Sequence, residues 1–320
     1  MIKEYRRKGK DVLCAASEDA NSARMGINMI LRRKISPYLY ILPAFIIYSI
    51  FVLYPLVDSL ILSFYEWNGL APRVFVGLDN YRHILTNDPI FRLSLINNIK
   101  WTIVSQLLPV NIGLIFAVVF SSKTFRRLPI FRSAIFFPTT LSMVIIALMW
   151  SWMYNPIFGL INNFLQFASR GTLPTFNWFA NPSTVIYYVA VAGSWGYTGV
   201  CMIMFMAALR AIPEEMFEAA AIDGANKIQQ FFYISIPQIR NILNVVVVFT
   251  LINSFRVFDV VRIMTNGGPG RSTNVLATWS YTQIFSHRNI GIGSAIAWVL
   301  TILVLLFSVF YIKLNKRKED

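Results

Sequence analysis

Six long runs of mostly apolar residues divide this chain. They lie at roughly 38–64, 99–120, 133–154, 184–208, 239–262 and 291–313. A helix needs about 20 mostly apolar residues to cross the hydrocarbon core of a membrane. Because lipid offers the backbone no hydrogen-bond partner, segments of this kind cross as helices. The sequence therefore predicts an all-α transmembrane protein with six spans.

The composition argues against a soluble enzyme. Hydrophobic residues make up 56% of the chain and charged residues 14%, whereas soluble domains carry about 25% charge. The net charge of +14 would also suit a nucleic-acid-binding protein. However, the basic residues lie at the ends of the apolar runs rather than on one polar face. We therefore interpret them as determinants of topology and expect no nucleic-acid partner.

The distribution of Lys and Arg predicts the orientation. Of 29 such residues, nine precede the first run, four lie between the second and third, three between the fourth and fifth, and four at the C-terminal end. These 20 share one side if both termini are cytoplasmic, as the positive-inside rule requires. Segments 65–98, 155–183 and 263–290 are then outside, and 209–238 is inside. Six tryptophans near outer span ends suggest an interfacial aromatic belt: Trp67, Trp101, Trp150, Trp152, Trp178 and Trp279.

The inner segment 209–238 is polar and helix-prone. Pro213 with the two acids that follow it predicts a helix start. Gly224 predicts a turn between two short helices, because glycine adopts backbone angles that other residues resist. Between them, a narrow alanine-rich helix could enter a cleft in a partner, with Glu218 and Asp223 as hydrogen-bond acceptors. The alternative is an ordinary amphipathic loop lying on the membrane surface.

Four blocks of sequence carry a family resemblance that extends from about Ile35 to Lys313. The blocks are Leu42-Pro43-Ala44 with Tyr54-Pro55; Val76-Gly77-Leu78-Asp79-Asn80-Tyr81; Ala208 to Pro213 leading into Glu218-Ala219-Ala220, Gly224 and Ile234-Ser235-Ile236-Pro237; and Ser254 to Asp259 with Gly267-Gly268-Pro269-Gly270. Together they resemble the permease subunits of binding-protein-dependent ABC importers, the inner membrane components of the carbohydrate type (maltose, multiple-sugar and glycerol-phosphate). The third block resembles the EAA loop of that family.

The resemblance has three departures. Ile236 stands where Leu is usual before the closing proline, and Arg240 where a second proline often occurs. We expect neither to disturb coupling. The large extra outer domain of some maltose-type permeases is absent, so the chain resembles the shorter, six-span kind.

The resemblance implies a type I ABC importer permease fold in the cytoplasmic membrane of a prokaryote. It also implies a second permease subunit, two ATP-binding subunits that hold ATP and Mg, and an extracytoplasmic solute-binding protein. The expected organisation is a basic tail at 1–34, a six-span domain at 35–314 and a short basic tail at 315–320. The residues expected to receive the ATPase stroke are Glu218, Ala219, Ala220, Asp223, Gly224 and Ala225.

Polar residues in the fifth span are candidates for the substrate path. Asn253, Arg256 and Asp259 recur at i, i+3 and i+6, which predicts one polar stripe on a helix. They could hydrogen-bond sugar hydroxyls; alternatively, Arg256 and Asp259 pair with each other or lie among headgroups. In the fourth span, Trp195 and Tyr197 could line the path, or could serve packing in a glycine-rich helix. Gln106 and Asn111 in the second span are equally open to either interpretation.

No catalytic or metal signature accompanies these features. The sequence has no GxxxxGK[ST] loop for ATP, no zinc-binding His/Glu pattern and no GxSxG nucleophile motif. Cys14 and Cys201 are too few for a metal site and too differently placed for a disulfide. We therefore expect a non-catalytic subunit without a cofactor of its own. The resemblance implies that it imports a carbohydrate, most simply an oligosaccharide. The alternatives are a glycerol-phosphate or other small-solute importer, a membrane enzyme, or a self-sufficient carrier.

Overall fold

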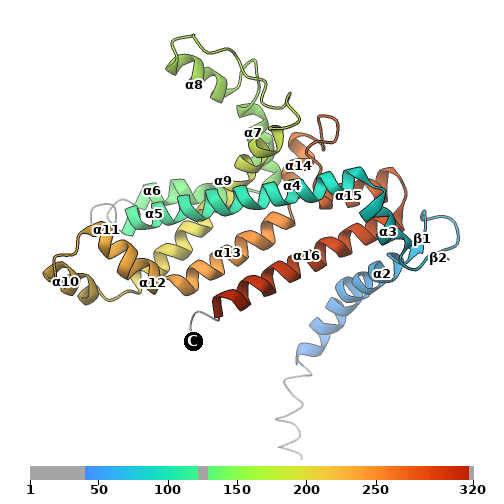
Figure 1. The fold of residues 1–320 in the computed structure, drawn as a ribbon, viewed down its shortest axis with the longest axis horizontal. Helices are drawn as coiled ribbons and strands as arrows, with labels where there is room; N and C mark the ends of the chain where they lie inside the picture. Colours follow the sequence, from blue (N-terminus) through green and yellow to red (C-terminus); the bar gives the residue numbers. More distant parts are fainter. Residues whose placement is uncertain (1–39, 122–128, 317–320) are drawn as a thin grey trace, which may run out of the picture. The chain divides into compact units, whose positions relative to one another are not determined.

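A computed structural model describes residues 40–121 and 129–316 (Figure 1). The chain divides into two compact units, Met1–Ile61 and Leu62–Asp320. Residues 1–39, 122–128 and 317–320 lie outside the described residues. They include the expected basic tail at 1–34 with Cys14, three of the four basic residues between the second and third apolar runs (Lys123, Arg126 and Arg127), and the end of the C-terminal tail.

The first unit contributes one apolar helix, which runs over Tyr40–Leu62 and matches the predicted first span. Its middle is a π-helical stretch, Ser49–Leu53, followed by α2, Tyr54–Leu62. Pro55 has no backbone N–H to donate to the preceding turn, so a wider turn there is expected. Most of its apolar side chains are exposed, as lipid-facing residues would be.

The second unit is a helical assembly with one small hairpin. Its two strands pair antiparallel, with Tyr65 opposite Phe75. The elements before the fourth predicted span are β1 Tyr65–Glu66, β2 Val74–Phe75, α3 Asp79–Thr86, α4 Pro89–Ser105, η2 Gln106–Val110, α5 Asn111–Ser121, α6 Pro129–Phe136, η4 Phe137–Thr140, α7 Met143–Met153 and α8 Leu160–Ala168. The later elements are α9 Val185–Arg210, α10 Glu214–Ile222, α11 Lys227–Gln230, η5 Phe231–Ser235, α12 Ile236–Gln238, α13 Arg240–Phe255, α14 Asp259–Met264, α15 Leu276–Tyr281, η6 Thr282–Ser286 and α16 Ile290–Lys316.

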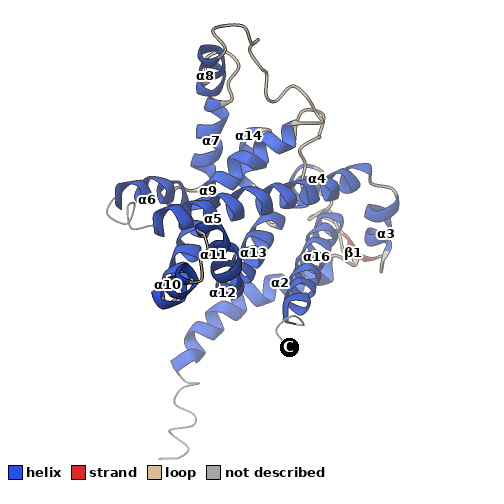
Figure 2. Ribbon diagram, turned by 60° about the vertical axis from the view of Figure 1, so that its left-hand side comes forward, coloured by secondary structure: helices blue, strands red, loops and turns tan. Residues whose placement is uncertain are grey.

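Helix α9 is the centre of this unit. It packs against α4, α5 and α13, which run beside it, and against α6 and α7 (Figures 1 and 2). Its glycines permit close approach: a Cβ on Gly193 would lie 2.7 Å from Trp101, one on Gly196 2.8 Å from Ile146, and one on Gly199 2.8 Å from the Cα of Phe136. These close contacts support the packing alternative for this glycine-rich helix.

The predicted start of the second span, residue 99, is wrong by ten residues. The helix begins at Pro89 and runs unbroken to Ser121. Asp88 caps it, because its Oδ1 accepts hydrogen bonds from the backbone N–H groups of Ile90 and Phe91, each at 2.9 Å. The polar pair Asn97 and Asn98 lowered the apparent hydropathy, yet both side chains are buried and hydrogen-bonded inside the protein.

The shifted boundary also corrects the predicted aromatic belt. Trp101 lies twelve residues inside the helix that starts at Pro89 and is 3% exposed, packed against Gly193. Trp279 is equally buried, and its Nε1 donates to Asp88 Oδ2 at 2.7 Å. These two tryptophans are therefore interior side chains rather than interfacial anchors.

The third predicted span is broken rather than straight, because it bends by 104° between Pro129–Thr140 and Met143–Met153. The segment Lys227–Gln238, which precedes the fifth predicted span, meets α13 at 71°. Ser142 starts α7 by accepting a hydrogen bond from Ile145 N. Within the described residues, four helices are long and apolar enough to cross a membrane, or up to six if each bent pair is one span.

A ladder of polar contacts joins α4 and α13. Thr102 Oγ1 and Ser254 Oγ are 2.9 Å apart, and Thr250 Oγ1 donates to Gln106 Oε1 at 3.0 Å. Thr102 on α4 and Gln106, the first residue of η2 in the same continuous helix, are four apart and so share one face. Gln106, which the sequence left open, therefore serves helix–helix contact in this chain. Asn111, also left open, donates to its own helix, at Leu107 O.

Candidate functional site

The segment 209–238 folds as two short helices joined by a tight turn. Helix α10 starts at Glu214, directly after Pro213, with acids in its first turn, so the predicted helix start is confirmed within one residue. Gly224 has φ +83°. The turn is a Schellman motif, because Ala225 N donates to Ala220 O at 2.8 Å and Gly224 N to Ala221 O at 3.1 Å.

A buried glutamine fixes the second helix against the first. Gln230 is 4% exposed, and its Nε2 donates to Ala225 O at 3.2 Å and to Phe217 O at 3.4 Å. Next to it, Asn226 and Gln229 form a reciprocal capping box at the start of α11. Gln230 was not among the predicted site residues. The Asn-x-x-Gln spacing of the capping box was a visible signal for this helix start.

The outward side of this turn is open. Glu218, Ala219, Asp223 and Gly224 are exposed, while Ala220 and Ala225 are half-buried. Apolar side chains stand beside them with nothing in the described part of this chain to cover them, namely Ile222, Ile228, Phe232 and Tyr233. On the other side, Ile212 and Ile239 are buried in a cluster with the ends of α5 and α9. The turn is therefore firmly held from within and presents small, acidic and apolar groups outward.

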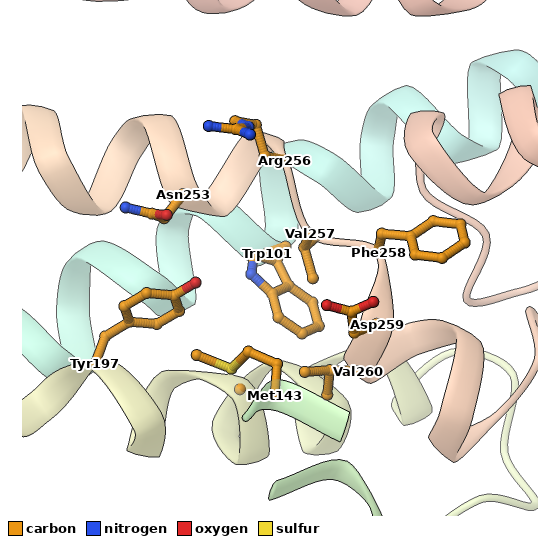
Figure 3. Close-up of a pocket in the computed structure, with 10 residues that line it drawn as sticks. Trp101, Met143, Tyr197, Asn253, Arg256, Val257, Phe258, Asp259 and Val260 are labelled. Carbon is orange, nitrogen blue, oxygen red and sulfur yellow. The ribbon is translucent and has the colours of Figure 1, made fainter. Parts of the chain in front are cut away.

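A second feature is a pocket of about 190 Å³ where α13 ends. Ten residues line it: Trp101, Met143, Gly193, Tyr197, Asn253, Arg256, Val257, Phe258, Asp259 and Val260 (Figure 3). The Tyr197 hydroxyl and the Asp259 carboxylate point toward the centre of the view, beside the Trp101 ring. Hydrogen-bonding groups thus share one cavity with the aromatic ring of Trp101.

The predicted helical stripe of three polar residues is wrong in its geometry. Helix α13 ends at Phe255, Arg256 follows it, and Asp259 begins α14. Asn253, Arg256 and Asp259 nevertheless line the same pocket, because the helix break turns the chain around it. In the described part of the chain no ion pair joins Arg256 to Asp259, and their charged groups point apart in Figure 3.

Trp195 and Tyr197 do not share a cavity. Tyr197 lines the pocket just described, whereas Trp195 lines a separate apolar pocket with Trp150, whose ring lies edge-on at 6.0 Å. Residues two apart on an α-helix point about 200° away from each other. The expectation that both face one path is therefore incompatible with a continuous α9.

The chain matches a family model over residues 110–319, described as "Binding-protein-dependent transport system inner membrane component". The chain belongs to this family. It is 38% identical to the probable ABC transporter permease protein YurN of Bacillus subtilis, over 91% of this chain and 100% of that protein. It is 31% identical to the trehalose/maltose transport system permease protein MalF of Thermococcus litoralis, over 88% and 94%.

A third relative is the arabinooligosaccharides transport system permease protein AraP of Bacillus subtilis, with 30% identity over 88% of this permease and 89% of that protein. Among solved structures, a chain of a bacterial ABC transporter that imports the acidic polysaccharide alginate matches with a TM-score of 0.77 and 21% identity, covering 89% and 96%. The predicted type I importer permease fold is thus confirmed. The permease is a multi-pass inner membrane component of an ABC transporter, not an enzyme, as the sequence predicted.

Proposed function

We propose that this chain is the transmembrane permease subunit of an ABC importer for a carbohydrate, of oligosaccharide size. The observation that supports a carbohydrate substrate is the similarity of this chain, over most of its length, to permeases named for trehalose/maltose and arabinooligosaccharides. The pocket supports it, because Tyr197 and Asn253 supply hydrogen-bonding groups beside the Trp101 ring.

The energy comes from partners. Two ATP-binding subunits hold ATP and Mg, and hydrolysis moves the turn at Glu218 to Ala225. A second permease subunit, different from this one, completes the pathway, and an extracytoplasmic solute-binding protein delivers the sugar. The open outward side of this turn, with Asp223 and Gly224 at its tip, supports its role as the ATPase contact. We place both termini and residues 209–238 in the cytoplasm, with the six-span domain at 35–314.

The pocket favours a neutral solute over glycerol phosphate. Its charged lining residues are one Arg and one Asp, Arg256 and Asp259. A phosphate would therefore meet one attractive and one repulsive charge, and the pocket offers no surplus of positive charge. An anionic solute therefore serves as the comparison in the uptake test.

The first experiment is to purify the tagged chain from its host in mild detergent and identify its partners by mass spectrometry. The complex and its binding protein are then reconstituted with ATP inside vesicles and offered maltotriose, arabinotriose, trehalose and glycerol 3-phosphate. Uptake of a sugar, reduced at least about tenfold by Asn253→Ala or Arg256→Gln, is the expected result; Asn111→Leu is the control. Uptake by the chain alone without an ATPase, or uptake of glycerol 3-phosphate in preference to sugars, would refute it.

A further inference from the structure

One buried amide bridges two helix ends that are far apart in sequence. Asn98 on α4 is fully buried. Its Nδ2 donates to the backbone oxygen of Phe255 at 3.2 Å, and its Oδ1 accepts from the backbone N–H of Leu276 at 2.8 Å. Phe255 is the last residue of α13 and Leu276 is the first of α15. Helix ends leave such groups without partners inside the helix, and Asn98 supplies one to each.

The stretch between these two points includes half of the pocket lining. Arg256 to Val260 all line it, and they follow Phe255 directly. At Phe258 the backbone leaves helical geometry, with φ −140° and ψ −60°. Without a continuous helix, the direction of each side chain there depends on where the chain leaves α13. The hydrogen bond from Asn98 to the backbone oxygen of Phe255 therefore fixes the position from which residues 256–260 begin.

Another lining residue comes from the same helix as Asn98. Trp101 lies one turn further along α4 and lines the pocket. The neighbouring Asn97 acts elsewhere, since its Nδ2 donates to Ser272 O at 2.7 Å and to Asn274 O at 2.9 Å. Helix α4 thus lines the pocket with Trp101 and contacts the start of the segment 256–260 through Asn98, while Asn97 holds the loop before α15.

We propose that Asn98 is a positioning residue for the pocket, which fixes residues 256–260 relative to Trp101. This inference rests on the proposed function in taking that pocket as the solute path. Asn98 makes no contact with the solute in this role and acts through the backbone of Phe255. Its replacement should free the wall carrying Arg256 and Asp259 without unfolding the spans.

The test is hydrogen–deuterium exchange on the complete purified transporter, comparing Asn98→Leu, Asn97→Leu and the exposed control Asn111→Leu. All three changes are the same substitution on one continuous helix. The contribution of a hydrogen bond to stability corresponds to about one power of ten in an equilibrium constant. The loss of the Asn98 hydrogen bonds should therefore raise the exchange rate at 256–260 roughly tenfold, and we expect this rise in Asn98→Leu alone. In Asn97→Leu the change should be confined to 272–275, and Asn111→Leu should match the wild type. Asn98→Ala, which adds no bulk, serves if the leucine variant fails to assemble.

Equal exchange at 256–260 in Asn98 and Asn97 variants, or a rise that extends equally to 214–238, would show general loosening and overturn the proposal. Exchange at 256–260 that stays at the wild-type rate would do the same. The proposed function fails separately: in that case the exchange pattern appears as expected, but Asn253→Ala and Arg256→Gln leave maltotriose and arabinotriose uptake unchanged.

Discussion

At the scale of single residues, Gly224 is where sequence reasoning and structure agree most closely. A glycine after an alanine-rich helix predicts a left-handed turn, and the φ of +83° with the paired Schellman hydrogen bonds confirms it. Gln230 shows the limit of such reasoning. Its two backbone acceptors lie five and thirteen residues away, and only the folded turn brings them to one amide.

Gly224 gives a sharp test because the chain leaves open space around it: a Cβ added at this residue would meet no described atom within 4 Å. Gly224→Val should lose most ATP-driven uptake, since a β-branched residue at positive φ costs about 1–2 kcal/mol. Gly224→Asn, similar in size but tolerant of that conformation, should retain most of it. Uptake measured in reconstituted vesicles checks this. Equal loss in both variants would mean that bulk at the ATPase contact, not backbone strain, is what matters.

At the scale of elements, the straight spans were easier to predict from the sequence than the breaks. The first, fourth and sixth apolar runs match helices Tyr40–Leu62, Val185–Arg210 and Ile290–Lys313 closely. The sequence did not predict the early start of α4, because the two asparagines of this helix lower its hydropathy. Both are buried, and their hydrogen-bond partners lie on distant segments. No proline or glycine marks the break after Phe255. The spacing of Arg256 and Asp259 therefore predicted one continuous helical stripe. For the third span, Pro138 and Ser142 were visible signals of a break.

The ladder between α4 and α13 should be measurable as a coupling. Thr102→Val and Ser254→Ala each remove one hydroxyl of the 2.9 Å contact. Hydrogen bonds between membrane helices contribute about 0.6 kcal/mol on average, so a double-mutant cycle in detergent unfolding should give a coupling of that size. Thr301→Val is the matched control, because the Thr301 hydroxyl donates to Ala297 O of its own helix. A coupling of Thr301 to Ser254 as large as that of Thr102 would contradict the ladder.

At the scale of the whole molecule, the predicted orientation stays a prediction, and cysteine labelling tests it. In a Cys14→Ser, Cys201→Ala background, Thr172→Cys and Ala221→Cys place one thiol each at exposed positions of segments 155–183 and 209–238. A membrane-impermeant maleimide should label Thr172→Cys in intact spheroplasts and Ala221→Cys only after permeabilisation. The reverse pattern would place the ATPase contact on the wrong side of the membrane and refute the assignment.

The bend at Ile239 has a mechanical consequence. Ile239 is 1% exposed and sits where Lys227–Gln238 meets α13 at 71°. Helix α13, with 16 residues, extends about 24 Å from this buried bend. A tilt of about 10° about this point displaces the far end by about 4 Å. On the proposed function, a small rotation imposed on Lys227–Gln238 would become, at Asn253 and Arg256, a shift larger than the length of a hydrogen bond.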